Sequence, residues 1–139
     1  MRVDARVDAY VPATYIESEA LKIDLHRRLA LAETEDELRE LHAAIEDRYG
    51  EVPEPVERLF QIQEAKLTLA AVGADYLVYR GGKATVGPLV LGSGELQAIR
   101  GRLDTAVYST GSREVTLRTD DFSRALELTD AILAARRAA

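Results

Sequence analysis

Hydrophobic positions alternate strictly along residues 2–11, with valine or alanine at every odd position and a charged residue or tyrosine at every even one. An alternation with period two is typical of a strand that buries one of its faces. Pro12 ends the pattern, because proline has no backbone N–H to donate to a neighbouring strand. Since the alternation begins directly after Met1, the sequence predicts that this chain is a piece of a longer polypeptide.

From residue 18 the hydrophobic period becomes that of a helix, and three apolar stripes follow one another. Thr34 and Glu37 have the spacing of a capping box, which predicts the start of the second helix. Gly50 and Gly73 supply the glycine that commonly follows the end of a helix. The stripes, at i+3 and i+4 spacing, are Leu21, Leu25, Leu29 and Ala32, then Leu38, Leu41, Ile45 and Tyr49, and then Val56, Leu59, Phe60, Leu67 and Ala71.

After residue 73 the sequence changes to short β-prone segments separated by turns. Residues 76–79 and 84–86 flank a Gly-Gly pair, and residues 106–109 and 114–117 flank a second turn. A helix is predicted over residues 95–103, and Asp120 or Asp121 is predicted to cap a last helix. The sequence therefore predicts an α+β fold, in which an N-terminal strand and three helices precede a ββαββα unit with a mostly antiparallel sheet.

No low-complexity linker divides the chain, and its 139 residues fall within the size range of one domain. We therefore predict a single domain over residues 1–139, with a helical half at 13–73 and a mixed α+β half at 74–139.

The composition offers little catalytic chemistry. The chain has no cysteine, and its two histidines, His26 and His42, lie in different predicted helices, so no metal site is expected. Residues 92–94 lack the full glycine pattern of a phosphate-binding loop, so no nucleotide cofactor is expected either. No apolar run reaches the ~20 residues of a membrane span. These features predict a cytoplasmic domain that is not an enzyme and has no catalytic residues.

The net charge of −6 is unevenly distributed. Residues 1–60 contain 8 Lys and Arg against 15 Asp and Glu, whereas residues 61–139 contain 10 against 9. Nucleic-acid binders need a basic surface to displace counterions, and the second half has no dense basic run. An acidic half suits a basic protein partner, but it is equally typical of solvated helix faces. Composition leaves both interpretations open.

The end of the second predicted helix carries the most informative acidic cluster. Glu46 and Asp47 fall in its last turn, where carboxylates oppose the helix macrodipole. Glu40, Ala44 and Asp47 follow at i, i+4 and i+7, opposite the apolar stripe. We call Glu40, Ala44, Glu46, Asp47 and Arg48 the acidic edge. One interpretation is a solvated face in which Arg48 softens the repulsion; the other is a docking surface for a partner's arginines.

Four segments together resemble a known family. They are Val-Asp-Ala-Tyr-Val-Pro at residues 7–12, Tyr15-Ile16, Glu37-Leu38, and Asp-Arg-Tyr-Gly-Glu-Val-Pro-Glu-Pro-Val at residues 47–56. In combination they resemble the C-terminal domain of the bacterial transcription-repair coupling factor (Mfd). The resemblance runs in recognisable motifs from Val3 to Gly73 and continues in the order of strands and helices to the end of the chain.

The resemblance implies a role within a much larger bacterial protein. Members of this family are multidomain ATP-driven DNA translocases that push stalled RNA polymerase off damaged DNA and recruit the excision-repair subunit UvrA. ATP and magnesium are bound by other domains of such proteins, which also engage RNA polymerase and DNA. The C-terminal domain is not catalytic. It docks on the N-terminal UvrB-like module of the same polypeptide, competes with UvrA, and restrains ATPase and translocase activity until RNA polymerase is engaged.

The resemblance also implies a contact surface. In the family, carboxylates on the helix before the Arg-aromatic-Gly sequence contact arginines of the UvrB-like module. Asp47 occupies the matching position, whereas the second family acid falls at Ala44, so Glu46 or Glu40 would take its place. Two alternatives remain from other classes of protein. One is a freestanding adaptor that uses the same acidic face, and the other is a small enzyme with a carboxylate-lined cleft.

Overall fold

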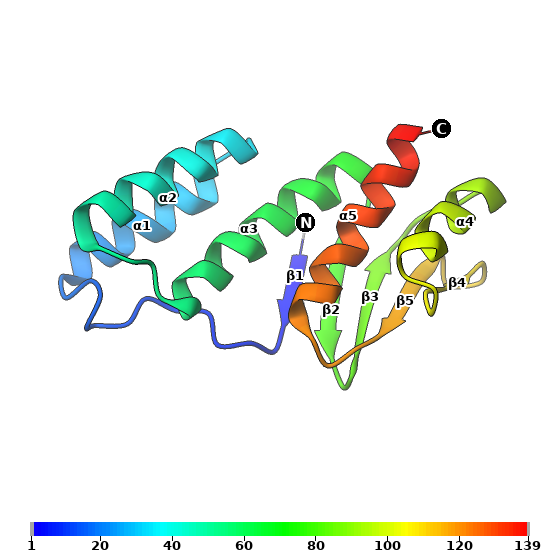
Figure 1. The fold of residues 1–139 in the computed structure, drawn as a ribbon, viewed down its shortest axis with the longest axis horizontal. Helices are drawn as coiled ribbons and strands as arrows, with labels where there is room; N and C mark the ends of the chain where they lie inside the picture. The colour runs from blue at the N-terminus through cyan, green and yellow to red at the C-terminus, as the bar shows by residue number, and fades with distance from the viewer. Residues whose placement is uncertain (1, 139) are drawn as a thin grey trace. The chain divides into compact units, whose positions relative to one another are not determined.

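The structure, a computed structural model, describes residues 2–138 (Figure 1). The chain forms two compact units. Residues 7–67 make up one, here called the helical unit, and residues 1–6 together with 68–139 make up the other, here called the sheet unit. The border at residue 67 lies inside α3 (Glu54–Val72), and the N-terminal strand belongs to the sheet unit. The grouping of both units into one domain stays a prediction.

The helical unit contains α1 (Glu19–Leu31), α2 (Glu35–Tyr49) and the first part of α3. The Ser18 hydroxyl caps α1, and Thr34 Oγ1 caps α2 by accepting a hydrogen bond from Glu37 N at 3.1 Å. The Glu37 carboxylate returns to Glu33 N at 2.9 Å, one residue before the position that a capping box predicts. The three predicted helices are confirmed.

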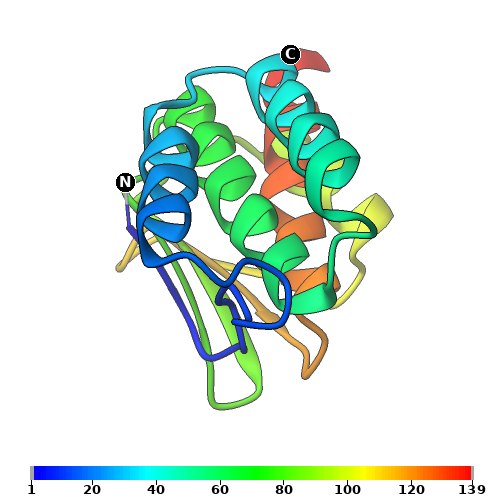
Figure 2. The same ribbon diagram turned by 90° about the vertical axis from the view of Figure 1, so that its left-hand side faces the viewer.

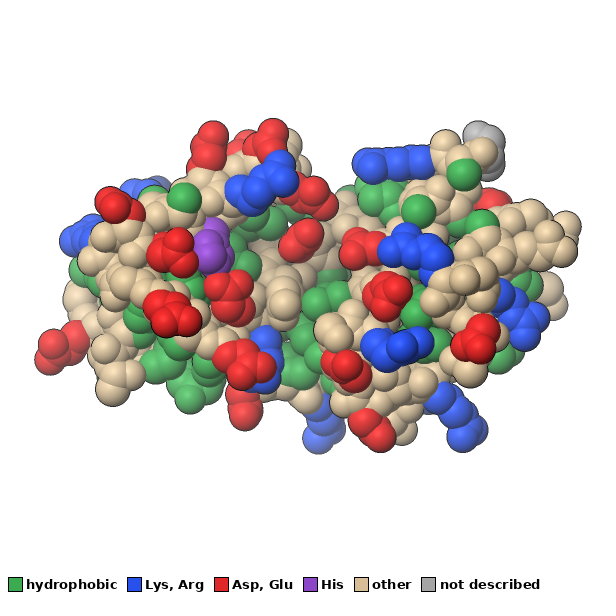
Figure 3. All heavy atoms as spheres, in the orientation of Figure 1, with side chains coloured by type: hydrophobic (Ala, Val, Ile, Leu, Met, Phe, Trp, Pro, Cys, Tyr) green, Lys and Arg blue, Asp and Glu red, His purple; other side chains and the backbone are tan. Residues whose placement is uncertain are grey.

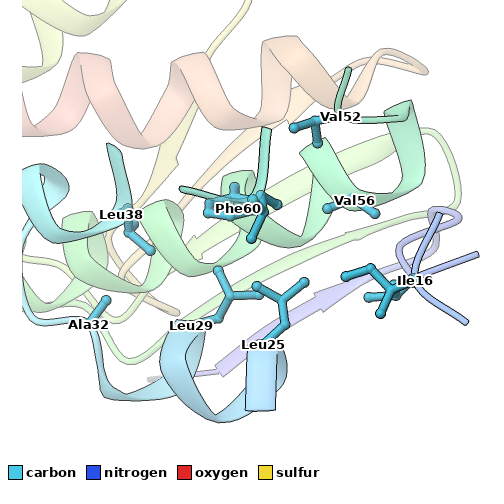
Figure 4. Packing of buried hydrophobic residues seen from close by; sticks show 10 residues of the cluster. Ile16, Leu25, Leu29, Ala32, Leu38, Val52, Val56 and Phe60 are labelled. Atoms are coloured by element: carbon cyan, nitrogen blue, oxygen red, sulfur yellow. The ribbon is translucent and has the colours of Figure 1, made fainter. Parts of the chain in front are cut away.

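The core of the helical unit lies between its three helices, with contributions from the segments that connect them. Figure 4 shows side chains from α1, α2 and α3 converging on one another. Leu41 and Tyr49, predicted to belong to the buried stripe of α2, are only partly buried at the rim of this core. The buried members of the cluster are Val11, Ile16, Leu25, Leu29, Ala32, Leu38, Ile45, Val52, Val56 and Phe60.

The sheet unit contains a five-stranded sheet in the order β1-β2-β3-β5-β4. β1 (Arg2–Ala5) pairs parallel with β2 (Tyr76–Arg80), and β3 (Lys83–Gly87), β4 (Val107–Ser109) and β5 (Glu114–Arg118) complete it with antiparallel pairings. Two helices, α4 (Ser93–Arg102) and α5 (Phe122–Ala138), belong to the same unit. The predicted α+β class with a mostly antiparallel sheet is confirmed.

The strand predicted over residues 2–11 is shorter than expected, because β1 ends at Ala5. Its partner β2 turns away after Arg80, so residues 7–11 have no strand to pair with. The alternation of exposure nevertheless continues, and Val11 is buried in the core of the helical unit.

Local turn chemistry sets the other boundaries of the sheet unit. Gly81 and Gly82 connect β2 to β3 with φ angles of 63° and 73°, as a two-residue hairpin of the primed type requires. Asp121 Oδ1 accepts hydrogen bonds from Ser123 N at 2.9 Å and Ser123 Oγ at 2.7 Å at the start of α5. These bonds lower the pKa of Asp121. The predicted cap is therefore Asp121 rather than Asp120.

The two faces of the sheet differ in exposure. The residues named below lie on one face and are buried. Figure 2 shows α5 lying along one side of the sheet. Residues on the other face are exposed or only partly buried. The buried set is Leu77, Tyr79, Ala84, Val86, Val115 and Leu117. No helix within residues 2–138 combines the length and the apolar character that a membrane crossing requires.

Candidate protein-docking surface

The acidic edge is a real surface of the helical unit. Glu40, Ala44, Glu46, Asp47 and Arg48 are all exposed. Glu40 and Asp47 lie on the side of α2 opposite its buried residues, whereas Ala44 and Arg48 line a hollow beside α1. Figure 3 shows acidic side chains gathered over α2 and the neighbouring part of α3. The helical unit has 7 Lys and Arg against 15 Asp and Glu, a net charge of −8.

The carboxylates of the acidic edge lack basic partners within the fold. Among the residues that the structure describes, Glu40, Glu46 and Asp47 form no ion pair. Arg48 instead places its guanidinium carbon 5.2 Å from the centre of the Tyr49 ring, a cation–π contact. Arg48 thus forms no ion pair with the carboxylates beside it among the described residues, and both interpretations of the acidic edge stay open. Two unpaired carboxylates in the last turn also oppose the helix macrodipole.

Tyr15 fixes the end of α2 on which this surface lies. Its hydroxyl donates to the carbonyl of Gly50, the C-cap residue of α2, at 2.9 Å, which satisfies an oxygen that the helix end leaves unpaired. The same hydroxyl lies 3.4 Å from the Ile45 carbonyl. Its ring packs against Tyr49 with 5.8 Å between centroids. Burial, and next the charge of Glu46, raise the pKa of Tyr15. The segment before α1 thus holds the last turn of α2 in place.

Sequence reasoning used Tyr15 only as part of a family motif and did not assign it this contact. The two residues that it joins, Tyr15 and Gly50, are 35 positions apart. No local pattern connects them, because the hydroxyl reaches a backbone carbonyl rather than a complementary side chain. The motifs assigned both segments to one family but predicted no contact between them.

Tyr15→Phe is expected to lower the free energy of unfolding of the helical unit by about 1 kcal/mol, the net value of one hydrogen bond. The ring stays, so its packing against Tyr49 is kept. Urea denaturation followed by circular dichroism measures the change. Tyr10→Phe is the matched control, because Tyr10 is 53% exposed and no side-chain hydrogen bond is seen for it. Equal midpoints for the two variants would mean that the Tyr15 hydroxyl does not hold α2.

A hollow of ≈ 270 Å³ lies on the side of α2 that faces α3. His42 Nε2 lies 2.5 Å from Glu57 Oε1, and the His42 ring meets Phe60 edge-on at 5.1 Å between centroids. The lining, Glu35, Leu38, Arg39, His42, Glu57, Phe60, Gln61 and Glu64, contains no serine, threonine, lysine or cysteine nucleophile.

The hollow contains the carboxylates that the small-enzyme alternative predicts, and two of its charged side chains have ionic partners. Of its three glutamates, Glu57 is engaged by a histidine, and Arg39 on the rim pairs with Asp36. Within residues 2–138, no group of three or more His, Cys, Asp or Glu side chains is arranged to hold a metal ion.

Comparison with known proteins places these features in a family. The model of the TRCF domain matches residues 5–87, more than half of the chain, and this range includes Tyr15 and the acidic edge. The chain is 36% identical over 81 residues to the transcription-repair-coupling factor of Staphylococcus epidermidis, 40% over 65 residues to that of Bacillus subtilis, and 37% over 73 residues to that of Mycobacterium tuberculosis. These alignments cover 58%, 47% and 52% of this chain, but only 7%, 6% and 6% of the relatives, so the chain spans a small part of their length.

The fold agrees with a solved structure. The crystal structure of a C-terminal domain of transcription-repair coupling factor superposes with a TM-score of 0.80 at 20% sequence identity, covering 99% of this chain and 94% of that one. The similarity in fold extends beyond residue 87, where the family match ends, into the rest of the sheet unit. The resemblance seen in the sequence motifs is therefore confirmed, and the chain belongs to the TRCF domain family.

Proposed function

We propose that this chain is a non-catalytic regulatory domain of a bacterial, cytoplasmic transcription-repair coupling factor. It docks through the acidic edge on the UvrB-like module of the same polypeptide. While docked, it masks the UvrA-binding surface and restrains ATPase and translocase activity. Engagement of RNA polymerase releases it. ATP and magnesium are bound by other domains of the parent protein, and these domains also engage RNA polymerase and translocate on DNA.

The observation that carries this proposal is the set of exposed carboxylates on α2 that form no ion pair within the described residues, Glu40, Glu46 and Asp47. Tyr15 anchors the last turn of α2, which carries Glu46 and Asp47. A charge that its own fold leaves uncompensated is available to a partner's arginine, which forms strong charge-assisted hydrogen bonds with carboxylates.

Intramolecular docking lets modest contacts act as a switch. Two parts of one polypeptide meet at an effective concentration in the millimolar range for a short flexible connection, so a weak interface is still mostly closed. A competing event that favours the open state by a few kcal/mol then shifts the population. An acidic edge of a few exposed carboxylates fits this regime better than it fits a permanent complex.

Asp47→Ala is expected to weaken docking on the separately produced UvrB-like module by about 1–2 kcal/mol, roughly five- to thirtyfold, because a partner's arginine loses its carboxylate. The thermal stability of the domain should stay level or rise slightly, since the change removes a charge that opposes the macrodipole. Titration calorimetry at low and moderate salt measures the affinity. Ala44→Glu is the reciprocal variant and should tighten docking, because it adds an acid one turn earlier.

Asp104→Ala is the matched control, an identical charge change at an exposed position in the sheet unit. It should dock like the wild type. In the full-length protein, Asp47→Ala should raise basal ATPase activity and UvrA binding together, because one undocking event exposes both. If Asp47→Ala and Asp104→Ala dock alike, the acidic edge is not the interface and the proposal is wrong.

A further inference from the structure

The exposed face of the sheet brings together basic residues that are scattered along the sequence. In the antiparallel register, Arg80 of β2 lies directly opposite Lys83 of β3, and Lys83 lies directly opposite Arg118 of β5. Directly opposed residues project to the same face, with Cβ atoms about 4.5–5.5 Å apart. All three are exposed, on the face opposite Leu77, Ala84 and Leu117. We call Arg80, Lys83 and Arg118 the basic row.

A fourth cation extends this line onto the first strand. Arg6 follows β1, its N–H donates to the Tyr79 carbonyl at 3.1 Å, and it is exposed. Because Ala5 pairs with Tyr79, Arg6 comes next to Arg80 in the parallel register. Figure 1 shows the ends of β1, β2 and β5 and the start of β3 along one edge of the sheet. With strands about 4.8 Å apart, four neighbouring strands spread the cations over ~14 Å.

The fold neutralises this line of charge only in part. Arg80 has an exposed contact with Asp4 at 3.8 Å, whereas Arg6, Lys83 and Arg118 form no ion pair among the described residues. Asp120, which follows β5, places its Oδ1 3.3 Å from where a Cβ on Gly82 would lie, beside the turn that leads to Lys83. Like charges directly opposite each other destabilise a sheet. The basic row therefore costs the fold stability, and a bound anion would remove that cost.

We propose that the basic row, with Arg6, binds the phosphate backbone of duplex DNA. A linear series of cations matches a linear series of phosphates, whose contacts in proteins come mainly from Arg, Lys and hydroxyl side chains. Thr85 and Thr116, opposite each other in the next register position of the same face, supply the hydroxyls. A docked protein segment would instead centre on large aromatic or apolar anchors.

The charge distribution between the two units supports this assignment. The sheet unit has 11 Lys and Arg against 9 Asp and Glu, a net charge of +2, whereas the helical unit is at −8. The acidic edge, in the helical unit, suits a basic partner. The basic row, in the sheet unit, suits an acidic one. The inference does not rest on the proposed docking function, because none of its residues lies in the helical unit. Contacts with phosphates do not involve the bases, so the binding is independent of DNA sequence. Because only three or four phosphates are contacted, it is also weak.

The test measures binding of the whole chain to a fluorescein-labelled duplex of about 20 base pairs by anisotropy, between about 50 and 200 mM salt. The wild type should show a slope of log affinity against log salt of about −3, as expected for three to four phosphate contacts. The double variant Lys83→Gln/Arg118→Gln should bind more weakly, and its slope should be shallower by about two units. The control Arg100→Gln/Arg102→Gln makes the same charge change at exposed positions of α4 and should keep the wild-type slope.

Lys83→Glu separates a binding role from a structural one. It replaces two like-charge pairs with two opposite-charge pairs across the strands, so the melting temperature should rise while DNA binding falls at least tenfold. Absence of DNA binding by the wild type at the lowest salt would overturn the proposal. Equal losses in the Lys83/Arg118 variant and the α4 control would overturn it as well. Tighter binding of a poly-glutamate peptide than of DNA would show that the basic row takes an acidic protein segment instead.

Discussion

Ile45→Ala is expected to lower the free energy of unfolding of the helical unit by about 2–5 kcal/mol. Ile45 is 7% exposed and belongs to the cluster in which residues of α1, α2 and α3 meet (Figure 4). Removing its three outer carbons takes away buried apolar surface and leaves a cavity that the helices fill only in part. Urea denaturation followed by circular dichroism measures the change.

The matched control is Ile23→Ala on α1. Ile23 is 66% exposed, so the same substitution should change the free energy of unfolding by no more than about 0.5 kcal/mol. Ile45→Ala should also weaken docking on the UvrB-like module, but only in proportion to the unfolded fraction, unlike Asp47→Ala. If the two isoleucine variants unfold at the same urea concentration, α2 is not held by this core.

The helices of the helical unit could be predicted from the sequence because the signals that define them are local. The hydroxyls of Ser18 and Thr34 cap α1 and α2, and Gly50 ends α2 at the predicted position. Periodicity gives the direction of a side chain but not its depth. Leu41 lies on the inward side of α2 and is nevertheless only partly buried, because the rim of the core ends there.

The first strand shows where local pattern stops being informative. Residues 2–11 alternate throughout, yet only Arg2–Ala5 pair, because the partner β2 begins more than 70 positions later and ends at Arg80. An alternating hydrophobic pattern indicates only that one side of an extended segment is buried. Burial in a sheet and burial in the core of the helical unit produce the same pattern. The sequence cannot tell which of these buries Val11.

The acidic edge and the basic row also differ in how far local sequence could predict them. The acidic edge lies within one helix, so helical spacing was enough to place Glu40 and Asp47 on its exposed side. The basic row depends on the pairing of β3 with β5, which joins Lys83 to Arg118 across 35 positions of sequence. A search for a dense basic run therefore missed it, since the density exists only after the sheet has formed.

Gly50→Ala is expected to destabilise the helical unit by about 2–3 kcal/mol. Gly50 has φ 92° and ψ −167°, a region of backbone conformation that only glycine adopts without strain. A Cβ at this position would meet no atom within 4 Å, so the cost is conformational rather than steric crowding by neighbours. Gly50 also donates to the Glu46 carbonyl at 2.9 Å and accepts the Tyr15 hydrogen bond, so relief of the strain would move the turn that carries Asp47.

The matched control is Gly101→Ala, in which the same methyl group also meets no atom within 4 Å but the residue lies in the helix α4. Alanine is the better helix former, so this variant should gain about 0.5–1 kcal/mol instead of losing stability. Thermal and urea denaturation compare the stabilities of the two glycine variants. Titration calorimetry with the UvrB-like module, at a temperature where both proteins are folded, should show that Gly50→Ala docks more weakly than Asp47→Ala. Gains in stability for both glycine variants would mean that residue 50 is free to leave the left-handed region, and the end of α2 would then not be the fixed platform that docking requires.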